Sequence, residues 1–91
     1  MLNRKSLNIL GHIYTINYSS AVKDSAHIYI DKLEIHISKE IRESRQEEGL
    51  FHEILEALNY HLGLELEHKQ TVAISEGLYS VLKLNNLLTK E

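Results

Sequence analysis

The spacing of apolar residues changes near residue 40, and this change constrains the fold more than any other feature. Before it, apolar and polar residues alternate, as at Leu33, Ile35 and Ile37. After it, apolar residues recur every three or four positions, at Phe51, Ile54, Leu55, Leu58 and Leu62. A period of two is typical of a half-buried strand, and a period of 3.6 is typical of an amphipathic helix. The sequence therefore predicts strands first and helices second.

Two β-hairpins are predicted, over residues 7–18 and 27–38. In the first hairpin Gly11 lies between two β-rich runs, where a glycine supplies the positive φ of a tight turn. In the second hairpin Asp31 and Lys32 occupy the turn, and the missing glycine leaves the turn type open.

Two amphipathic helices are predicted to follow, over residues of about 41–62 and 67–84. Gly63 stands where a left-handed residue would end the first helix. The tail, residues 86–91, is expected to fray. The buried stripe of the second helix is expected to consist of Thr71, Ile74, Leu78, Val81 and Leu82.

The chain has the size and composition of one small domain, residues 1–91. It is 43% hydrophobic and 25% charged, which is ordinary for a globular protein. Two hairpins and two helices of this size bury their apolar faces against one another, so we expect a two-layer α+β fold. A core this small also favours a homodimer that buries an edge strand or a helix face.

Charge and composition exclude several classes of function. The formal net charge is −3 and the basic residues are scattered, so the chain lacks the basic patch that nucleic-acid binding needs. It has no cysteine, which excludes disulfides and thiolate metal sites. We see no signal peptide and no apolar run near the roughly 18 residues of a membrane span, so we expect a cytoplasmic protein without membrane contact.

One segment of the first predicted helix carries residues typical of metal chemistry. His52 and Glu56 are four positions apart, so they point to the same side of a helix. In the His-Glu-x-x-His pattern of zinc peptidases, the two histidines bind zinc and the glutamate activates water. His52 matches the first ligand and Glu53 matches the catalytic glutamate, whereas Glu56 stands in place of the second histidine.

The order of short motifs along the chain extends this similarity beyond the one helix. The segments in question are Ile30-Asp31 to Ile35, Leu50-Phe51-His52-Glu53-Ile54-Leu55-Glu56-Ala57-Leu58, Leu62-Gly63-Leu64 and Gly77-Leu78-Tyr79-Ser80-Val81-Leu82. In this order and spacing, over residues 7–86, the chain resembles a family of small phage and prophage proteins related to zincin-type metallopeptidases. The resemblance implies a minimal zincin-like core, and a phage-encoded protein of this kind would act in the host cytoplasm.

The resemblance also implies a set of metal ligands. It places the third ligand at Glu76 on the second helix, with His68 at the start of that helix as an alternative. A set of His52, Glu56 and Glu76 would bring two formal negative charges to the metal. Such a site makes zinc a weaker Lewis acid and shifts preference toward harder ions such as Mn²⁺ or Mg²⁺.

Three functions stay open at this point. The first is a degenerate zincin-like protein without peptidase activity that serves as a binding or regulatory module for a protein partner. The second is an active metal-dependent hydrolase that uses Glu53 beside a His-Glu-Glu site. The third is a structural or host-protein-binding domain without metal, in which the carboxylates at positions 48, 53 and 56 form a solvated helix face.

The remaining histidines are expected to have structural roles. His12, His27 and His36 fall on predicted strands or turns, where histidines are mostly exposed or hydrogen-bonded. His61 lies near a helix C-terminus, where the helix dipole favours a partly charged imidazole.

Overall fold

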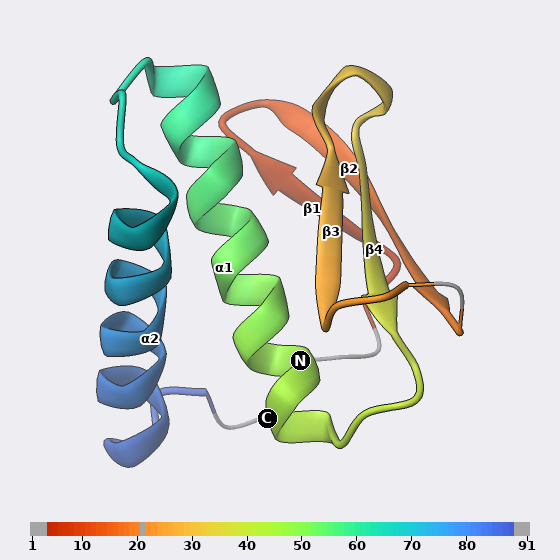
Figure 1. Ribbon diagram of the computed structural model, residues 1–91, viewed down its shortest axis with the longest axis vertical. Coiled ribbons are helices and arrows are strands. Elements are labelled where there is room, and N and C mark those ends of the chain that lie inside the picture. Colours follow the sequence, from red (N-terminus) through yellow and green to blue (C-terminus); the bar gives the residue numbers. More distant parts are fainter. Residues whose placement is uncertain (1–3, 21, 89–91) are drawn as a thin grey trace.

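A computed structural model describes residues 4–20 and 22–88 of the chain. Figure 1 shows a four-stranded sheet followed along the chain by two helices, which confirms the predicted α+β fold. A short 3₁₀ turn (Ile30–Lys32) connects the third and fourth strands. The elements are β1 (Ser6–Ile9), β2 (His12–Ser19), β3 (Ala26–Tyr29), β4 (Glu34–Ser38), α1 (Glu43–Leu62) and α2 (His68–Leu84).

The sheet has the strand order β1-β2-β4-β3. Each predicted hairpin forms, because β1 pairs antiparallel with β2 and β3 pairs antiparallel with β4. The two hairpins join through a parallel pair of β2 and β4, so the sheet is mixed rather than wholly antiparallel. This arrangement leaves β3 at one edge. Gly11 adopts a φ of 88°, as its position between the first two strands predicts.

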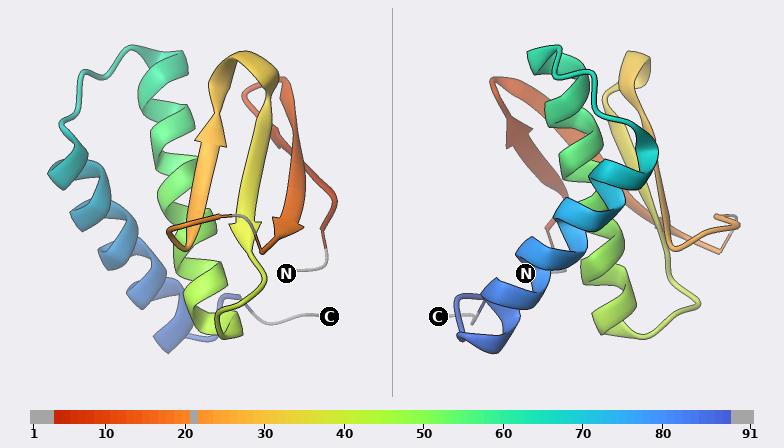
Figure 2. Two further views of the ribbon diagram at one scale, coloured as in Figure 1. Left: turned by 45° about the vertical axis from the view of Figure 1, so that its right-hand side comes forward. Right: turned by 60° about the vertical axis from the view of Figure 1, so that its left-hand side comes forward.

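The helices form two successive layers on one side of the sheet, so the predicted two-layer arrangement is wrong and the fold has three layers (Figure 1). α1 lies against β1, β3 and β4, whereas α2 packs mainly on α1 (Figures 1 and 2). The inward residues of the strands and one face of α1 share a single core. Its buried members are Ile9, Tyr14, Ile16, Ala26, Ile35, Ile37, Leu50 and Ala57.

Local contacts fix where α1 ends and α2 begins. Gly63 adopts the expected left-handed conformation, and its N–H bonds to the carbonyls of Asn59 and Tyr60. The Asn59 side chain donates to the Leu66 carbonyl and accepts from the Leu66 N–H. Glu67 and Gln70 then form a capping box at the start of α2. Hydrogen bonds therefore fix both ends of the link between the helices.

The predicted buried stripe of α2 is wrong in its orientation. Thr71 is buried and Leu82 is partly buried, as predicted, but Ile74, Leu78 and Val81 are exposed. Ser75 and Tyr79 complete the buried face in their place. The reason lies in polar contacts that hydrophobic spacing does not detect. Thr71 and Tyr79 each donate a hydroxyl hydrogen bond to a carboxylate of α1, and these bonds rotate α2 so that its hydroxyl-bearing side faces α1.

Hydrogen-bonded turns follow α2 at the end of the described chain. The Leu87 N–H bonds to the Leu82 carbonyl at 2.8 Å, so residues 85–88 turn back after α2. The rest of the predicted frayed tail, residues 89–91, lies outside the described residues. Among the helices that the structure describes, none combines the length and the apolar character that a membrane crossing needs.

Candidate metal centre

His52 and Glu56 lie one turn apart on the side of α1 that faces a cavity. The His52 Nε2 atom is 3.4 Å from Glu56 Oε2, as expected for two residues that share one face of a helix. Both side chains are partly buried. The cavity has a volume of about 630 Å³ and lies between α1, α2 and the edge strand β3.

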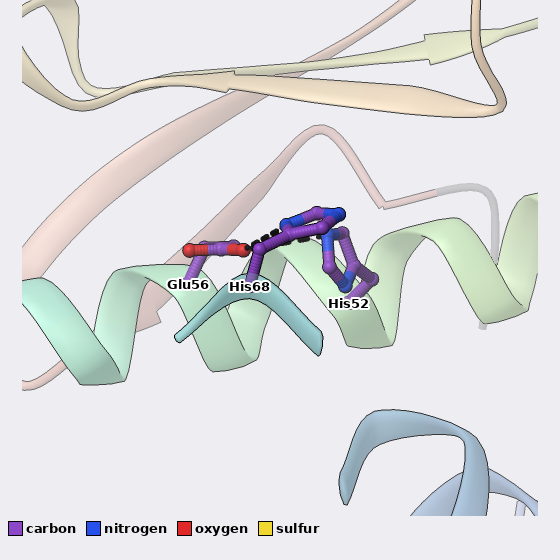
Figure 3. A group of neighbouring side chains, drawn as sticks. All are labelled: His52, Glu56 and His68. Carbon is purple, nitrogen blue, oxygen red and sulfur yellow. Dashed lines mark hydrogen bonds and ion pairs between the residues drawn. The ribbon is translucent and has the colours of Figure 1, made fainter. Parts of the chain in front are cut away.

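His68 brings a third donor to this pair from the first turn of α2. Its Nδ1 atom is 3.3 Å from the same Oε2 atom of Glu56. One ligand atom from each of His52, Glu56 and His68 lies within 4.8 Å of the other two (Figure 3). Because α2 starts at His68, the hydrogen bonds that fix the link between the helices also fix the position of this residue.

The distances from the two imidazoles to Glu56 suit a tetrahedral metal ion. Zinc bonds to nitrogen and oxygen at about 2.0–2.2 Å, which places two neighbouring ligands of a tetrahedral site roughly 3.3–3.5 Å apart. The two distances to Glu56 Oε2, 3.3 and 3.4 Å, fall in this range. The imidazole of His68 is largely exposed, and its ring lies edge-on to that of His52 with centroids 5.1 Å apart.

Thr71 is not one of the three donors, but it donates a hydrogen bond to Glu56. Its side chain is fully buried, and its Oγ1 atom donates to Glu56 Oε2 at 2.9 Å. The same hydroxyl lies 2.7 Å from the carbonyl oxygen of His68. Thr71 therefore connects the carboxylate on α1 with the backbone of the residue that carries the third donor. Contacts of this kind orient metal ligands in known metal sites.

Burial favours the neutral form of the His52 imidazole, which is the form that binds metal. Desolvation lowers the pKa of His52, and the nearby His68 lowers it further. The carboxylates of Glu56 and Glu76 act in the opposite direction and raise the pKa of His52. Desolvation has the largest effect, so the net shift is downward.

Glu53 lies in the cavity but is far more buried than a solvated helix face predicts. Only 5% of the residue is exposed. Burial raises the pKa of its carboxyl group to about 7, and the charges of Glu56 and Asp24 add to the effect. Because a general base works best when its pKa is near the working pH, this shift suits the role that the sequence motif predicts for Glu53.

Glu76 lines the same cavity and influences His52 electrostatically. Among the described residues, however, Glu76 is not part of the three-donor group of His52, Glu56 and His68. The structure thus brings together two residues of the predicted ligand set and the alternative third residue, His68. Sequence spacing alone did not select His68, because the choice depends on the angle at which α2 crosses α1.

The other histidines lie away from this cluster, and some make specific contacts. His61 stacks on His12 with ring centroids 4.0 Å apart, and its Nε2 atom is 2.7 Å from the buried Tyr14 hydroxyl. His27 and His36 face each other across β3 and β4. His36 also bonds to Glu34 at 3.0 Å. His27 is exposed and lines the edge of the cavity as well.

Comparisons of the chain with protein-family models, curated proteins and solved structures find no match.

Proposed function

We propose that the protein is a metal-dependent hydrolase of the zincin type, in which His52, Glu56 and His68 hold a zinc ion. The observation that carries this proposal is the approach of three donors, from two helices, within 4.8 Å of one another. The predicted motif supplies two of these donors, and the fold adds the third.

The donor set fits zinc better than the set expected from the sequence. Two neutral imidazoles and one carboxylate leave a net charge of about +1 on a divalent ion, whereas one imidazole and two carboxylates neutralise it. The His₂Glu combination is a common one in catalytic zinc sites. A zinc ion held by these residues would supply Lewis-acid catalysis of hydrolysis. The second imidazole also favours zinc over the harder ions Mn²⁺ and Mg²⁺.

The side chains of this chain then have distinct roles. His52, Glu56 and His68 bind the ion, and Thr71 holds Glu56 in place. Glu53 takes up the proton that is released when water attacks the substrate, because its pKa of about 7 lets it both accept and return a proton.

The resemblance of the motif order to small phage and prophage zincin-like proteins supports peptide bonds as the substrate class. It also supports a site of action in the cytoplasm of the host cell. The cavity beside β3 is lined by Glu53 and by all three residues of the ligand cluster.

A second candidate is a non-catalytic module that uses the same site to hold a metal or a protein partner. The burial of Glu53 favours it, because a carboxylate that is only 5% exposed has limited access to substrate. The candidate without any metal keeps the fold and gives the ligand cluster a structural role only.

Zinc loading combined with an activity assay separates these candidates. The protein is purified without a histidine tag, stripped with chelator, reloaded with zinc and assayed against a library of quenched fluorescent peptides. We expect one zinc ion per chain and hydrolysis that falls at least about 100-fold in Glu53→Gln, which keeps its zinc. Bound zinc without hydrolysis would favour the non-catalytic module. A protein that binds no zinc would rule out both metal-dependent functions.

A further inference from the structure

The outward side of α2 carries no charged residue over most of its length. The charged side chains of this helix point elsewhere, as with Lys83, which contacts Glu47 of α1. At about 100° per residue, the uncharged side covers an arc of about 160°. We call this surface the α2 outer face, and it consists of Ala73, Ile74, Gly77, Leu78, Ser80, Val81 and Leu84.

The large apolar residues of the α2 outer face are well exposed. The exposed fractions are 45% for Ile74, 42% for Leu78, 55% for Val81 and 78% for Leu84. In Figures 1 and 2, α1 lies on one side of α2, and no other described element lies on its far side. Neither α1 nor the sheet therefore covers these apolar side chains.

We propose that a second copy of the chain covers the α2 outer face, with the two α2 helices packed antiparallel about a two-fold axis near Leu78. Along the helix axis, Leu78 lies near the middle of the face. An antiparallel pair therefore brings each Ile74 opposite the Val81 of its partner. Positions 74, 78 and 81 have the four-three spacing of a helix–helix seam. A two-fold interface uses the same patch on both copies.

The charge of the chain favours a second copy, rather than a charged surface, as the partner that covers the α2 outer face. The chain has a net charge of −3, so two copies repel each other wherever their charged surfaces meet. The α2 outer face is a surface on which two copies make contact without bringing like charges together. It also lacks the basic residues by which an amphipathic helix binds anionic lipid.

Gly77 gives separate support for a close helix partner. Glycine inside a helix destabilises it relative to alanine. In the single chain a Cβ atom at Gly77 would meet no packed neighbour within 4 Å, so the chain's own packing does not require glycine there. The missing side chain does allow a partner helix to approach the α2 outer face closely.

The area of the face is sufficient for a specific but modest dimer. Its exposed residues present on the order of 500 Å² per copy, or about 1,000 Å² for the pair, which is near the lower limit for a specific interface. Association in the micromolar range is therefore expected.

Sedimentation velocity in the presence of chelator tests the proposal, since chelator prevents exposed histidines from linking copies through metal. Over about 5–500 μM protein, we expect a reversible monomer–dimer equilibrium. Leu78→Glu is expected to raise the dissociation constant at least about 30-fold. Gly77→Ala is expected to weaken the dimer as well. The matched control is Leu62→Glu, which changes a leucine at the end of α1 that is at least as exposed as Leu78 and is expected to leave association unchanged.

Cross-linking provides a second readout, because the chain contains no cysteine. A cysteine introduced by Leu78→Cys lies near the two-fold axis and is expected to form a disulfide-linked dimer under mild oxidation, whereas Leu62→Cys is not. A wild-type protein that stays monomeric throughout the concentration range would overturn the proposal. Equal association of Leu78→Glu and wild type would do the same, and so would a monomer that binds anionic vesicles through this face.

Discussion

Glu56 is the residue at which the candidate metal site converges. His52, His68 and Thr71 all approach its Oε2 atom, at distances between 2.9 and 3.4 Å. The Glu56 carboxylate also lies beside the first turn of α2, where the helix N-terminus favours a negative charge. A glutamate in place of the motif's second histidine therefore still leaves three donors close together. Glu56 contributes a carboxylate where the motif has an imidazole, and His68 brings a second imidazole from the other helix.

The hydroxyl of Thr71 is expected to matter for metal affinity as well as for stability. Thr71→Val keeps the shape of the side chain but removes the donor to Glu56 Oε2. We expect zinc affinity, measured by competition with a chromophoric chelator, to fall about 10-fold. Thr71→Ser is expected to restore it. Ser75→Ala is the matched control, because this buried hydroxyl contacts only the Val72 carbonyl among the hydrogen bonds described for its side chain. Equal losses in Thr71→Val and Ser75→Ala would contradict a positioning role.

The buried carboxyl of Glu53 is expected to make stability depend on pH in the metal-free protein. Its pKa is about 7 in the folded chain and 4.5 as a free side chain, so the folded state binds the proton more tightly. The stabilisation is fully present below about pH 4.5 and is lost as the pH rises through about 7. The difference corresponds to roughly 3 kcal/mol at most. The lowered pKa of His52 acts with the opposite sign, because its contribution is lost as the pH falls.

Urea unfolding at several pH values isolates the contribution of Glu53. Glu53→Gln stays neutral, so its stability relative to wild type is expected to rise by about 2–3 kcal/mol between pH 4.5 and pH 8. The exposed Glu40→Gln is the control and is expected to show no such trend. If the two variants track each other across this pH range, Glu53 is not buried as the structure has it.

At the scale of elements, polar contacts between the helices decide how α2 sits on α1. The Tyr79 hydroxyl donates to Glu47 Oε1 at 2.8 Å, and Lys83 Nζ lies 3.3 Å from the same oxygen. Glu47 and Tyr79 are both buried. Burial and this hydrogen bond raise the pKa of Tyr79 to about 12, so the phenol keeps its proton at pH values at which an ordinary tyrosine ionises.

Removing this hydroxyl tests how strongly it holds the helices together. Tyr79→Phe leaves the buried Glu47 carboxylate with one donor fewer, and we expect a loss of about 1–2 kcal/mol in the free energy of unfolding. The measurement is urea denaturation followed by far-UV circular dichroism. Tyr60→Phe removes the same group from an exposed side chain and is expected to change stability by less than about 0.5 kcal/mol. A Tyr79→Phe protein as stable as Tyr60→Phe would show that the contact does not stabilise the pair.

The sequence predicts most of the elements but not how they pack, for physical reasons that the helices illustrate. Hydrophobic period identifies α1 and α2 within a few residues, and Gly11 and Gly63 mark turns that need a positive φ. The outward position of Ile74 does not follow from period alone, because the hydroxyl contacts of Thr71 and Tyr79 to α1 and the packing of the Tyr79 ring on Phe51 involve the opposite side of α2. The choice of His68 over Glu76 has the same origin, since both depend on the rotation of α2.

At the scale of the whole molecule, the fold brings the start of α2 beside the middle of α1 and places both next to the edge strand β3. Figure 3 shows the result, in which donors that are far apart in the sequence lie together. The cavity, the buried Glu53 and the ligand cluster occupy one side of α2, and the proposed dimer face occupies another. Metal binding and self-association are therefore independent properties in this account.

Zinc binding by wild type, His68→Ala and Glu76→Gln, measured by isothermal titration calorimetry on tag-free protein, tests the central claim most directly. The proposed ligand set predicts one zinc ion per wild-type chain, a loss of affinity of at least about 100-fold in His68→Ala, and a change of less than about threefold in Glu76→Gln. Wild-type affinity in His68→Ala, or a larger loss in Glu76→Gln than in His68→Ala, would contradict the assigned ligand set.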